Sequence, residues 1–241
     1  MIIRLLSIFA SFCLCTAAVA APPQVAVDIG HTLSDSGAIS ARGRSEFSFN
    51  QVLGRQVADA LLSRQLGVRE VNFAGDIASL YARPLAAAGS DFFISIHHDS
   101  IGEAYLKPWQ WEGKAQTYTD VKRGFGIFVS ANNPDLATSL RCASTIGAVL
   151  RRVGFEPSPW HSRKHSPADA ENGVWYYDNL VVLYRTTLPA VLFEAGVIKH
   201  RDEELELLDL ERQARMADAV ATGIAACLFA GQDEAAPEKT D

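Results

Sequence analysis

The chain has no excess of basic residues. Lys and Arg number 22 against 28 Asp and Glu, which gives a formal net charge of −6 over 241 residues. Binding to nucleic acid calls for a basic patch or stripe that neutralises phosphates. The composition therefore provides no electrostatic case for nucleic acid as a partner.

The chain also lacks an apolar run long enough to cross a bilayer, which takes about 20 residues. The longest candidate, residues 5–19, follows Arg4 and leads into Ala20 and Ala21. A short basic start, an apolar stretch and small residues at its end are typical of a signal peptide. We expect residues 1–20 to be removed and the mature protein, without a stable membrane span, to be periplasmic or extracellular. An uncleaved anchor is the alternative.

Cysteine is scarce. Of the four cysteines, Cys13 and Cys15 lie in the predicted signal peptide, whereas Cys142 and Cys227 lie in segments predicted to be helical. Export would place the second pair where a disulfide persists. Two separate buried thiols are an equally good interpretation, because pairing depends on a Cα separation that a sequence does not show.

Strand-like and helix-like patterns alternate along the chain. Strands are expected at residues 24–28, 68–73, 92–97, 126–130 and 189–194, and helices at 46–61, 77–88, 134–153 and 202–228. Asn132, Asn133 and Pro134 resemble a helix cap with proline at the first helical position. This order predicts a single-domain α/β fold with a largely parallel (mixed) β-sheet and helices on both faces.

Two segments fall outside the alternation. Residues 155–178 fit neither pattern, and we expect a loop-rich segment that could overhang a site. Residues 21–230 suffice for one well-buried core and not for two domains. Residues 231–241 lack apolar anchors and are expected to be a disordered tail.

Polar residues stand where predicted strands end or helices begin. His31 follows the first strand, Glu46 opens the first helix and His97 ends the third strand. The carboxyl ends of parallel strands meet at one edge of a sheet. Two imidazoles and one carboxylate form a known ligand set for catalytic zinc, with the fourth position left to water. Glu194, at the end of another apolar strand, could take a proton from such a water.

Each of these residues has an ordinary structural explanation when taken alone. A histidine at a strand end is more often hydrogen-bonded structure than a ligand, and Glu46 is favoured at a helix start by the helix dipole. Asp28 and Asp99 could orient an imidazole or serve loop hydrogen bonds. We expect the remaining histidines at the surface: His161, His165 and His200.

The ordered motifs at residues 25–31, Glu46, residues 94–97 and residues 189–196 resemble those of the zinc-dependent N-acetylmuramoyl-L-alanine amidases of the Amidase_3 type. The resemblance extends over residues 25–228. It implies that His31, Glu46 and His97 hold one Zn²⁺ and that Glu194 is the catalytic carboxylate. It also implies a peptidoglycan substrate, cut between N-acetylmuramic acid and L-alanine.

One departure from the family pattern concerns the third ligand, which is usually followed by a small residue. Here His98 follows His97, and the position in the motif favours His97. A zinc peptidase acting on cell-wall peptides and an inactive wall-binding homologue are the rival functions. A further hypothesis is an envelope activator protein that opens residues 155–178.

Aromatic residues of the loop-rich segments could stack on the sugar rings of such a substrate. Packing of irregular loops onto the domain is the better interpretation. These residues are Trp109, Trp111, Trp160, Trp175, Tyr176 and Tyr177.

Overall fold

The computed structural model describes residues 21–234, so the predicted signal peptide and residues 235–241 lie outside the described residues. A seven-stranded sheet runs in the order β2-β1-β3-β9-β6-β8-β7. Its strands are β1 (Gln24–Ile29), β2 (Gly67–Val71), β3 (Phe92–Asp99), β6 (Gly126–Val129), β7 (Pro167–Asp169), β8 (Val174–Tyr176) and β9 (Ala190–Val197). The first four neighbours in this order are parallel, and β6 then runs antiparallel to β9.

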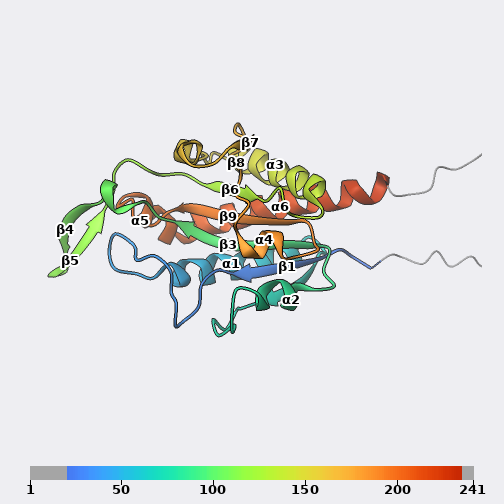
Figure 1. The fold of residues 1–241 in the computed structure, drawn as a ribbon, viewed down its shortest axis with the longest axis horizontal. Coiled ribbons are helices and arrows are strands. Elements are labelled where there is room, and N and C mark those ends of the chain that lie inside the picture. Colours follow the sequence, from blue (N-terminus) through green and yellow to red (C-terminus); the bar gives the residue numbers. More distant parts are fainter. Residues whose placement is uncertain (1–20, 235–241) are drawn as a thin grey trace, which may run out of the picture.

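Helices cover both faces of the sheet (Figure 1). One face carries α1 (Glu46–Leu62), α3 (Leu136–Arg152) and α6 (Leu210–Glu234), and the other carries the shorter α2 (Ala82–Ala87) and α4 (Val181–Tyr184). Strand residues alternate between the two cores: Val27 and Ile94 face the long helices, and Ala26 and Phe93 face the short ones. This arrangement confirms the predicted α/β fold with a largely parallel, mixed sheet.

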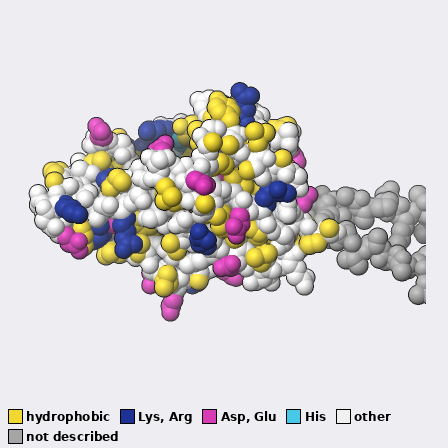
Figure 2. All heavy atoms as spheres, turned by 90° about the horizontal axis from the view of Figure 1, so that it is seen from below, with side chains coloured by type: hydrophobic (Ala, Val, Ile, Leu, Met, Phe, Trp, Pro, Cys, Tyr) yellow, Lys and Arg dark blue, Asp and Glu magenta, His cyan; other side chains and the backbone are white. Residues whose placement is uncertain are grey.

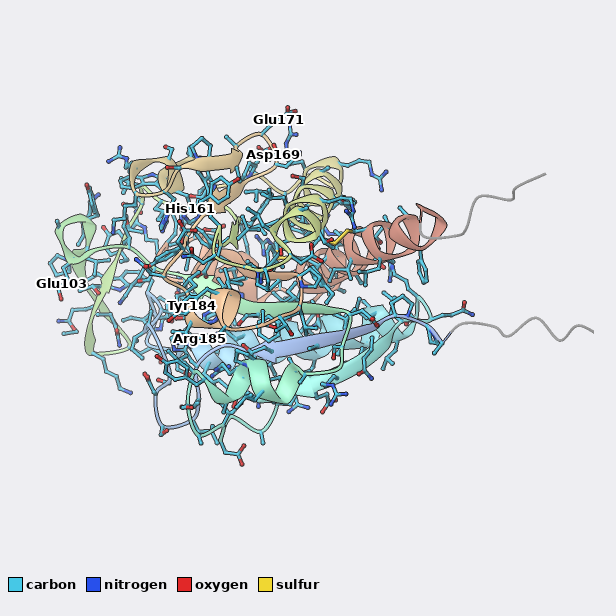
Figure 3. The ribbon with its side chains drawn as sticks, turned by 45° about the vertical axis from the view of Figure 1, so that its right-hand side comes forward. Glu103, His161, Asp169, Glu171, Tyr184 and Arg185 are labelled. Carbon is cyan, nitrogen blue, oxygen red and sulfur yellow. A yellow bond between two sulfur atoms is a disulfide. The ribbon has the colours of Figure 1, made fainter. Side chains whose placement is uncertain are left out.

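Cys142 on α3 and Cys227 on α6 form a disulfide, with Cα atoms 5.2 Å apart, and both side chains are buried. Figure 3 draws this bond between the two helices. The bond resolves the alternative of two separate thiols.

Several predicted boundaries are wrong for identifiable reasons. Helix α2 begins at Ala82 instead of residue 77, because Ser79 accepts the Ala82 N–H and ends a preceding loop. Helix α3 is capped by Asp135, whose carboxylate accepts from Thr138 N, and not by the residues before Pro134. The expected last helix is two helices, α5 (Glu203–Leu208) and α6, because Asp209 is extended and caps the Arg212 N–H.

The end of the chain also differs from expectation. Helix α6 continues to Glu234, which includes the first four residues of the range expected to be a disordered tail. The rest of that range lies outside the described residues.

Residues 155–178 are more ordered than expected. They contain the short helix η2 (Pro159–Arg163) and the strands β7 and β8, and β8 pairs with β6 inside the main sheet. Val174 and Trp175 are buried. Residues of η2 and just after it, together with Tyr177, line the cavity at Glu194 that is described below. Deleting the whole segment would also remove the strands β7 and β8 from the sheet.

A β-hairpin that the sequence did not predict projects from one end of the molecule (Figure 1). Its strands are β4 (Lys107–Trp111) and β5 (Lys114–Tyr118), joined by Glu112 and Gly113, which both have positive φ. Trp109 and Trp111 stack on each other, and Arg42 lies over both rings. The hairpin tryptophans therefore pack on each other and on Arg42, which agrees with the interpretation that the aromatic residues of these loops have a packing role.

The surface carries charges of both signs. On the face drawn in Figure 2, Lys and Arg side chains are interspersed with Asp and Glu side chains. Within residues 21–234, no helix combines the length and apolar character needed to cross a membrane.

Candidate metal centre and active site

His31 stands directly after β1 in an unusual backbone conformation, with φ of 64°. Its carbonyl accepts hydrogen bonds of 2.6 Å from both Asn72 Nδ2 and Arg83. Arg83 is itself buried and paired with Asp28. Residues held in sparsely populated conformations persist only where the surroundings fix them, and they cluster at functional sites. This network fixes the His31 backbone at the edge of the sheet.

Glu46 lies between the two predicted histidine ligands. His31 Nε2 and His97 Nδ1 are each 3.0 Å from Glu46 Oε1. One donor atom from each of the three residues lies within 4.8 Å of the others, and in the described part of the chain this is the one such group of three or more metal-binding side chains. The sequence therefore selected three residues that the fold brings together.

Two glycines make room for this cluster. A Cβ on Gly30 would lie 2.2 Å from His97 Nε2, and a Cβ on Gly37 would lie 2.6 Å from Glu46 Oε2. Gly37 also has φ of 74°, which favours glycine. The absence of side chains at both positions lets the His97 and Glu46 side chains pack against the backbone.

Electrostatics keep Glu46 ionised. Burial alone would raise the pKa of Glu46, but the hydrogen bonds from His31 and His97 outweigh it and hold the pKa well below its usual range. Burial lowers the pKa of His31, and the bond to Glu46 reverses this and leaves the pKa raised. The Glu46 carboxylate is thus negatively charged and lies between two imidazole rings, an arrangement that can bind a cation.

His98 points to the opposite face of the sheet from His97. It is buried against α1, and its Nδ1 is 2.8 Å from Asn50 Oδ1. Burial lowers the pKa of His98 to about 3, so its ring is neutral. Of the two neighbouring histidines, only His97 contacts Glu46 through its side chain.

Glu194 stands beside His97 in the sheet. It is the register partner of His97 on β3 and of Gly126 on β6, and paired residues direct their side chains to the same face. A Cβ on Gly126 would lie 2.4 Å from His161 Nε2, so the His161 ring takes the space that a side chain there would fill. His97, Glu194 and His161 therefore form a row across one face at the sheet edge.

Buried polar atoms without partners mark this row. Within the described residues, Glu194 Oε2 and His161 Nε2 are buried and have no hydrogen-bond partner. Burial, followed by the negative charges of Asp99 and Glu46, raises the pKa of Glu194 well above its usual range. Perturbed groups of this kind in a cavity are candidates for proton transfer.

Asp99, Lys122 and His161 complete the surroundings of Glu194. The Lys122 ammonium contacts the Asp99 carboxylate and donates a 2.8 Å hydrogen bond to Ser100 O. His161 Nε2 is 3.5 Å from Asp99 Oδ2. Asp99 does not orient a ligand imidazole, and neither does Asp28, which bonds to Arg83 and Ser95.

The sequence missed His161 and Lys122. His161, predicted at the surface, is only 4% exposed, and His200, in another part of the fold, is only 6% exposed. His165 is half-buried. No local pattern could have identified His161 or Lys122, because both come from irregular segments and reach Asp99 only through the tertiary fold.

The chain matches the model of a family described as N-acetylmuramoyl-L-alanine amidase over residues 25–226. A search of curated proteins finds no match.

Among solved structures, the chain is similar to an N-acetylmuramoyl-L-alanine amidase from Clostridium difficile 630, with 20% identity, a TM-score of 0.65 and coverage of 92% of this chain and 100% of that chain. It is similar to Ami1 from Mycobacterium smegmatis, with 19% identity, a TM-score of 0.70 and coverage of 87% and 98%. A third is the CwlD amidase from Clostridioides difficile in complex with the GerS lipoprotein, with 18% identity, a TM-score of 0.66 and coverage of 86% and 99%.

At these identities the solved structures share the fold with this chain. The family match spans nearly all of the described residues, from β1 into α6, and includes His31, Glu46, His97 and Glu194. The chain belongs to the N-acetylmuramoyl-L-alanine amidase family.

Proposed function

We propose that this chain is a zinc-dependent amidase that cuts the bond between N-acetylmuramic acid and L-alanine in peptidoglycan. In this proposal His31, Glu46 and His97 hold one Zn²⁺, and Glu194 transfers the proton. The observation that carries it is the cluster of three donor atoms beside a buried carboxyl oxygen without a partner.

The donor set fits zinc. Ligands about 2.1 Å from zinc in a tetrahedron are about 3.4 Å from one another, close to the 3.0 Å that separates Glu46 Oε1 from each imidazole nitrogen. Two neutral imidazoles and a carboxylate also leave one position open, as in catalytic sites. When bound, zinc would polarise the substrate carbonyl and lower the pKa of a water molecule.

The residues of the chain would then move one proton. As a carboxylate, Glu194 accepts a proton from the water that attacks the carbonyl carbon. Its raised pKa favours holding that proton until the C–N bond breaks. The carboxyl group then donates the proton to the departing nitrogen. The products are a carboxylate on the sugar side and a free amine on L-alanine.

We also propose that the protein acts in the periplasm or outside the cell. The Cys142–Cys227 bond supports this location, because disulfides persist in oxidising compartments. An envelope partner is a further part of the proposal, supported by the CwlD amidase, which was solved with the GerS lipoprotein.

Digestion of purified peptidoglycan tests the amidase proposal. The mature protein should release stem peptides with a free L-alanine amine and leave the glycan strands intact, as read by mass spectrometry. A chelator should abolish release, and added zinc should restore it. Cuts within the peptide would support the zinc peptidase instead. Binding to the wall without products, in a protein that holds zinc, would indicate a missing partner or a binding role.

The Glu194→Gln variant separates proton transfer from metal binding. We expect kcat to fall by about 100-fold or more, since general acid–base catalysis contributes about 10²–10⁴-fold, while zinc content stays at the wild-type level. Glu171→Gln is the matched control, because Glu171 is exposed and pairs with Arg151 away from the site. Normal turnover by Glu194→Gln would show that another group carries the proton.

A further inference from the structure

Glu194 opens into a cavity of about 730 Å³ that the ligand histidines do not line. The cavity is bounded by the loop after β3 and by the η2 segment. Its charged lining consists of Asp99, Lys122, Arg163, Lys164 and Glu194. Three cations therefore face two carboxyl groups, and one of those, Asp99, is already paired with Lys122.

This positive balance is local. The chain as a whole carries a net charge of −6, and the face in Figure 2 mixes both signs. His31 and His97 line a different cavity of about 380 Å³. Its charged lining is Asp35 and Arg83, and Arg83 is neutralised by Asp28. Of these two cavities, the one at Glu194 has more cations than carboxyl groups in its lining, and such a cavity attracts anionic ligands.

Two of the cations are free to bind a ligand. Arg163 lies over the Trp160 ring, 3.9 Å from its centroid, which holds the guanidinium plane while leaving its N–H groups at the edge. Within the described residues, neither Arg163 nor Lys164 has an ion-pair partner. Both side chains belong to exposed residues.

The aromatic lining is already engaged with itself. Tyr105 packs edge-on against Trp160 at 5.0 Å, and His165 packs against Tyr177 at 4.5 Å. Stacking on a sugar requires a free ring face. With Arg163 over Trp160, the cavity favours a charged ligand over a neutral sugar.

The proposed reaction also places the peptide part of the substrate in the cavity at Glu194. Glu194 must reach the departing nitrogen to protonate it, and that nitrogen belongs to the peptide. The sugar side ends in the carbonyl, which lies toward the ligand histidines. The peptide therefore extends into the cavity that Glu194 lines.

We propose that this cavity is the peptide subsite and that Arg163 and Lys164 bind a carboxylate of the stem peptide. The substrate class is thus a muramoyl peptide with a free carboxylate, preferred over its amidated counterpart. This inference rests on the proposed amidase function and adds which side of the bond each cavity receives.

The test compares two muramoyl tripeptides that differ only in having a carboxylate or a carboxamide on the second residue, and a second pair that differs in the same way at the C-terminus. Wild-type protein should cleave the carboxylate form of at least one pair with a lower KM. Arg163→Ala/Lys164→Ala should raise that KM about fivefold, from two exposed charge pairs, and should leave kcat and the KM of the amidated form nearly unchanged.

Lys114→Ala/Arg141→Ala is the matched control, since it also removes one exposed Lys and one exposed Arg but outside the cavity. It should change neither KM. Added salt should reduce the wild-type preference. Equal KM values for both members of both pairs, or equal losses on carboxylate and amide in the variant, would overturn the inference while leaving the amidase function intact. Failure of the wild type to cleave any muramoyl peptide or peptidoglycan would instead overturn the proposed function.

Discussion

Replacing Gly30 by alanine should remove His97 from the proposed zinc site. The new Cβ would lie 2.2 Å from Nε2, 2.3 Å from Cε1 and 2.5 Å from Cδ2 of the His97 ring. Carbon contacts are comfortable at about 3.5–4.0 Å, so the ring must move by about 1 Å or more. Zinc sites tolerate deviations of only about 0.2 Å in ligand distance. His97 would therefore no longer reach a shared metal with His31 and Glu46.

We expect zinc affinity to fall by about 100-fold or more, since even changes to residues that merely orient ligands cost about 10–100-fold. Competition with a chromophoric chelator measures this loss. Gly67→Ala, in β2, is the matched control, because its Cβ would be 3.5 Å from the nearest atom, which belongs to Gln24 of β1. Urea denaturation of both variants shows whether the fold is kept. A folded Gly30→Ala protein with wild-type zinc affinity would refute the assignment of His97 as a ligand.

Two further predictions concern stability. Replacing Cys142 and Cys227 together by alanine should lower the free energy of unfolding by about 4.5 kcal/mol, the loop entropy of a closure of this length, since the bond joins residues 85 apart; a loss below about 1 kcal/mol in urea denaturation would contradict this. Burial lowers the pKa of His161 to about 3. In the unfolded chain the pKa of a histidine is about 6.5, so below that pH the unfolded chain binds a proton that the folded protein does not. The free energy of unfolding therefore has its full value above about pH 6.5 and falls as the pH is lowered from there toward 3. In metal-free protein, the free energy of unfolding of His161→Gln should therefore fall by about 2 kcal/mol less than that of the wild type between pH 7 and pH 5. An unchanged dependence of the free energy of unfolding on pH would count against it.

The parts of the fold that sequence predicted well are those with strong periodicity and simple ends. The apolar strands around Val27 and Ile94 and the long helix α1 follow directly from residue pattern. Errors occur where one polar side chain decides a boundary, as Asp209 does between α5 and α6. The hairpin is not predicted, because Glu112-Gly113 is not one of the strong two-residue turn signals, such as Asn-Gly or Asp-Gly, and the segment around Trp109 and Trp111 reads as a loop.

The choice between His97 and His98 illustrates what a strand can and cannot specify. Successive strand residues point to opposite faces, so only one of the two can meet Glu46. The sequence established that the choice existed, and motif position favoured His97. The contact of His98 with Asn50 on the α1 side supplies the physical reason, and it required the packing of α1 against β3.

The change of strand direction between β9 and β6 explains why the site residues on the β6 side were not predicted from the carboxyl ends of the strands. His31, His97 and Glu194 lie at or near the carboxyl ends of parallel strands, which is where ligand-binding residues are expected from the sequence. Because β6 runs the other way, its first residue, Gly126, arrives at the same edge. The residues beside Glu194 on the β6 side therefore precede this strand, as Lys122 does, or pack onto β6 from η2. A mixed sheet thus places the proposed metal ligands on its parallel side and the proposed peptide subsite at the reversal, with Glu194 on the strand that borders both.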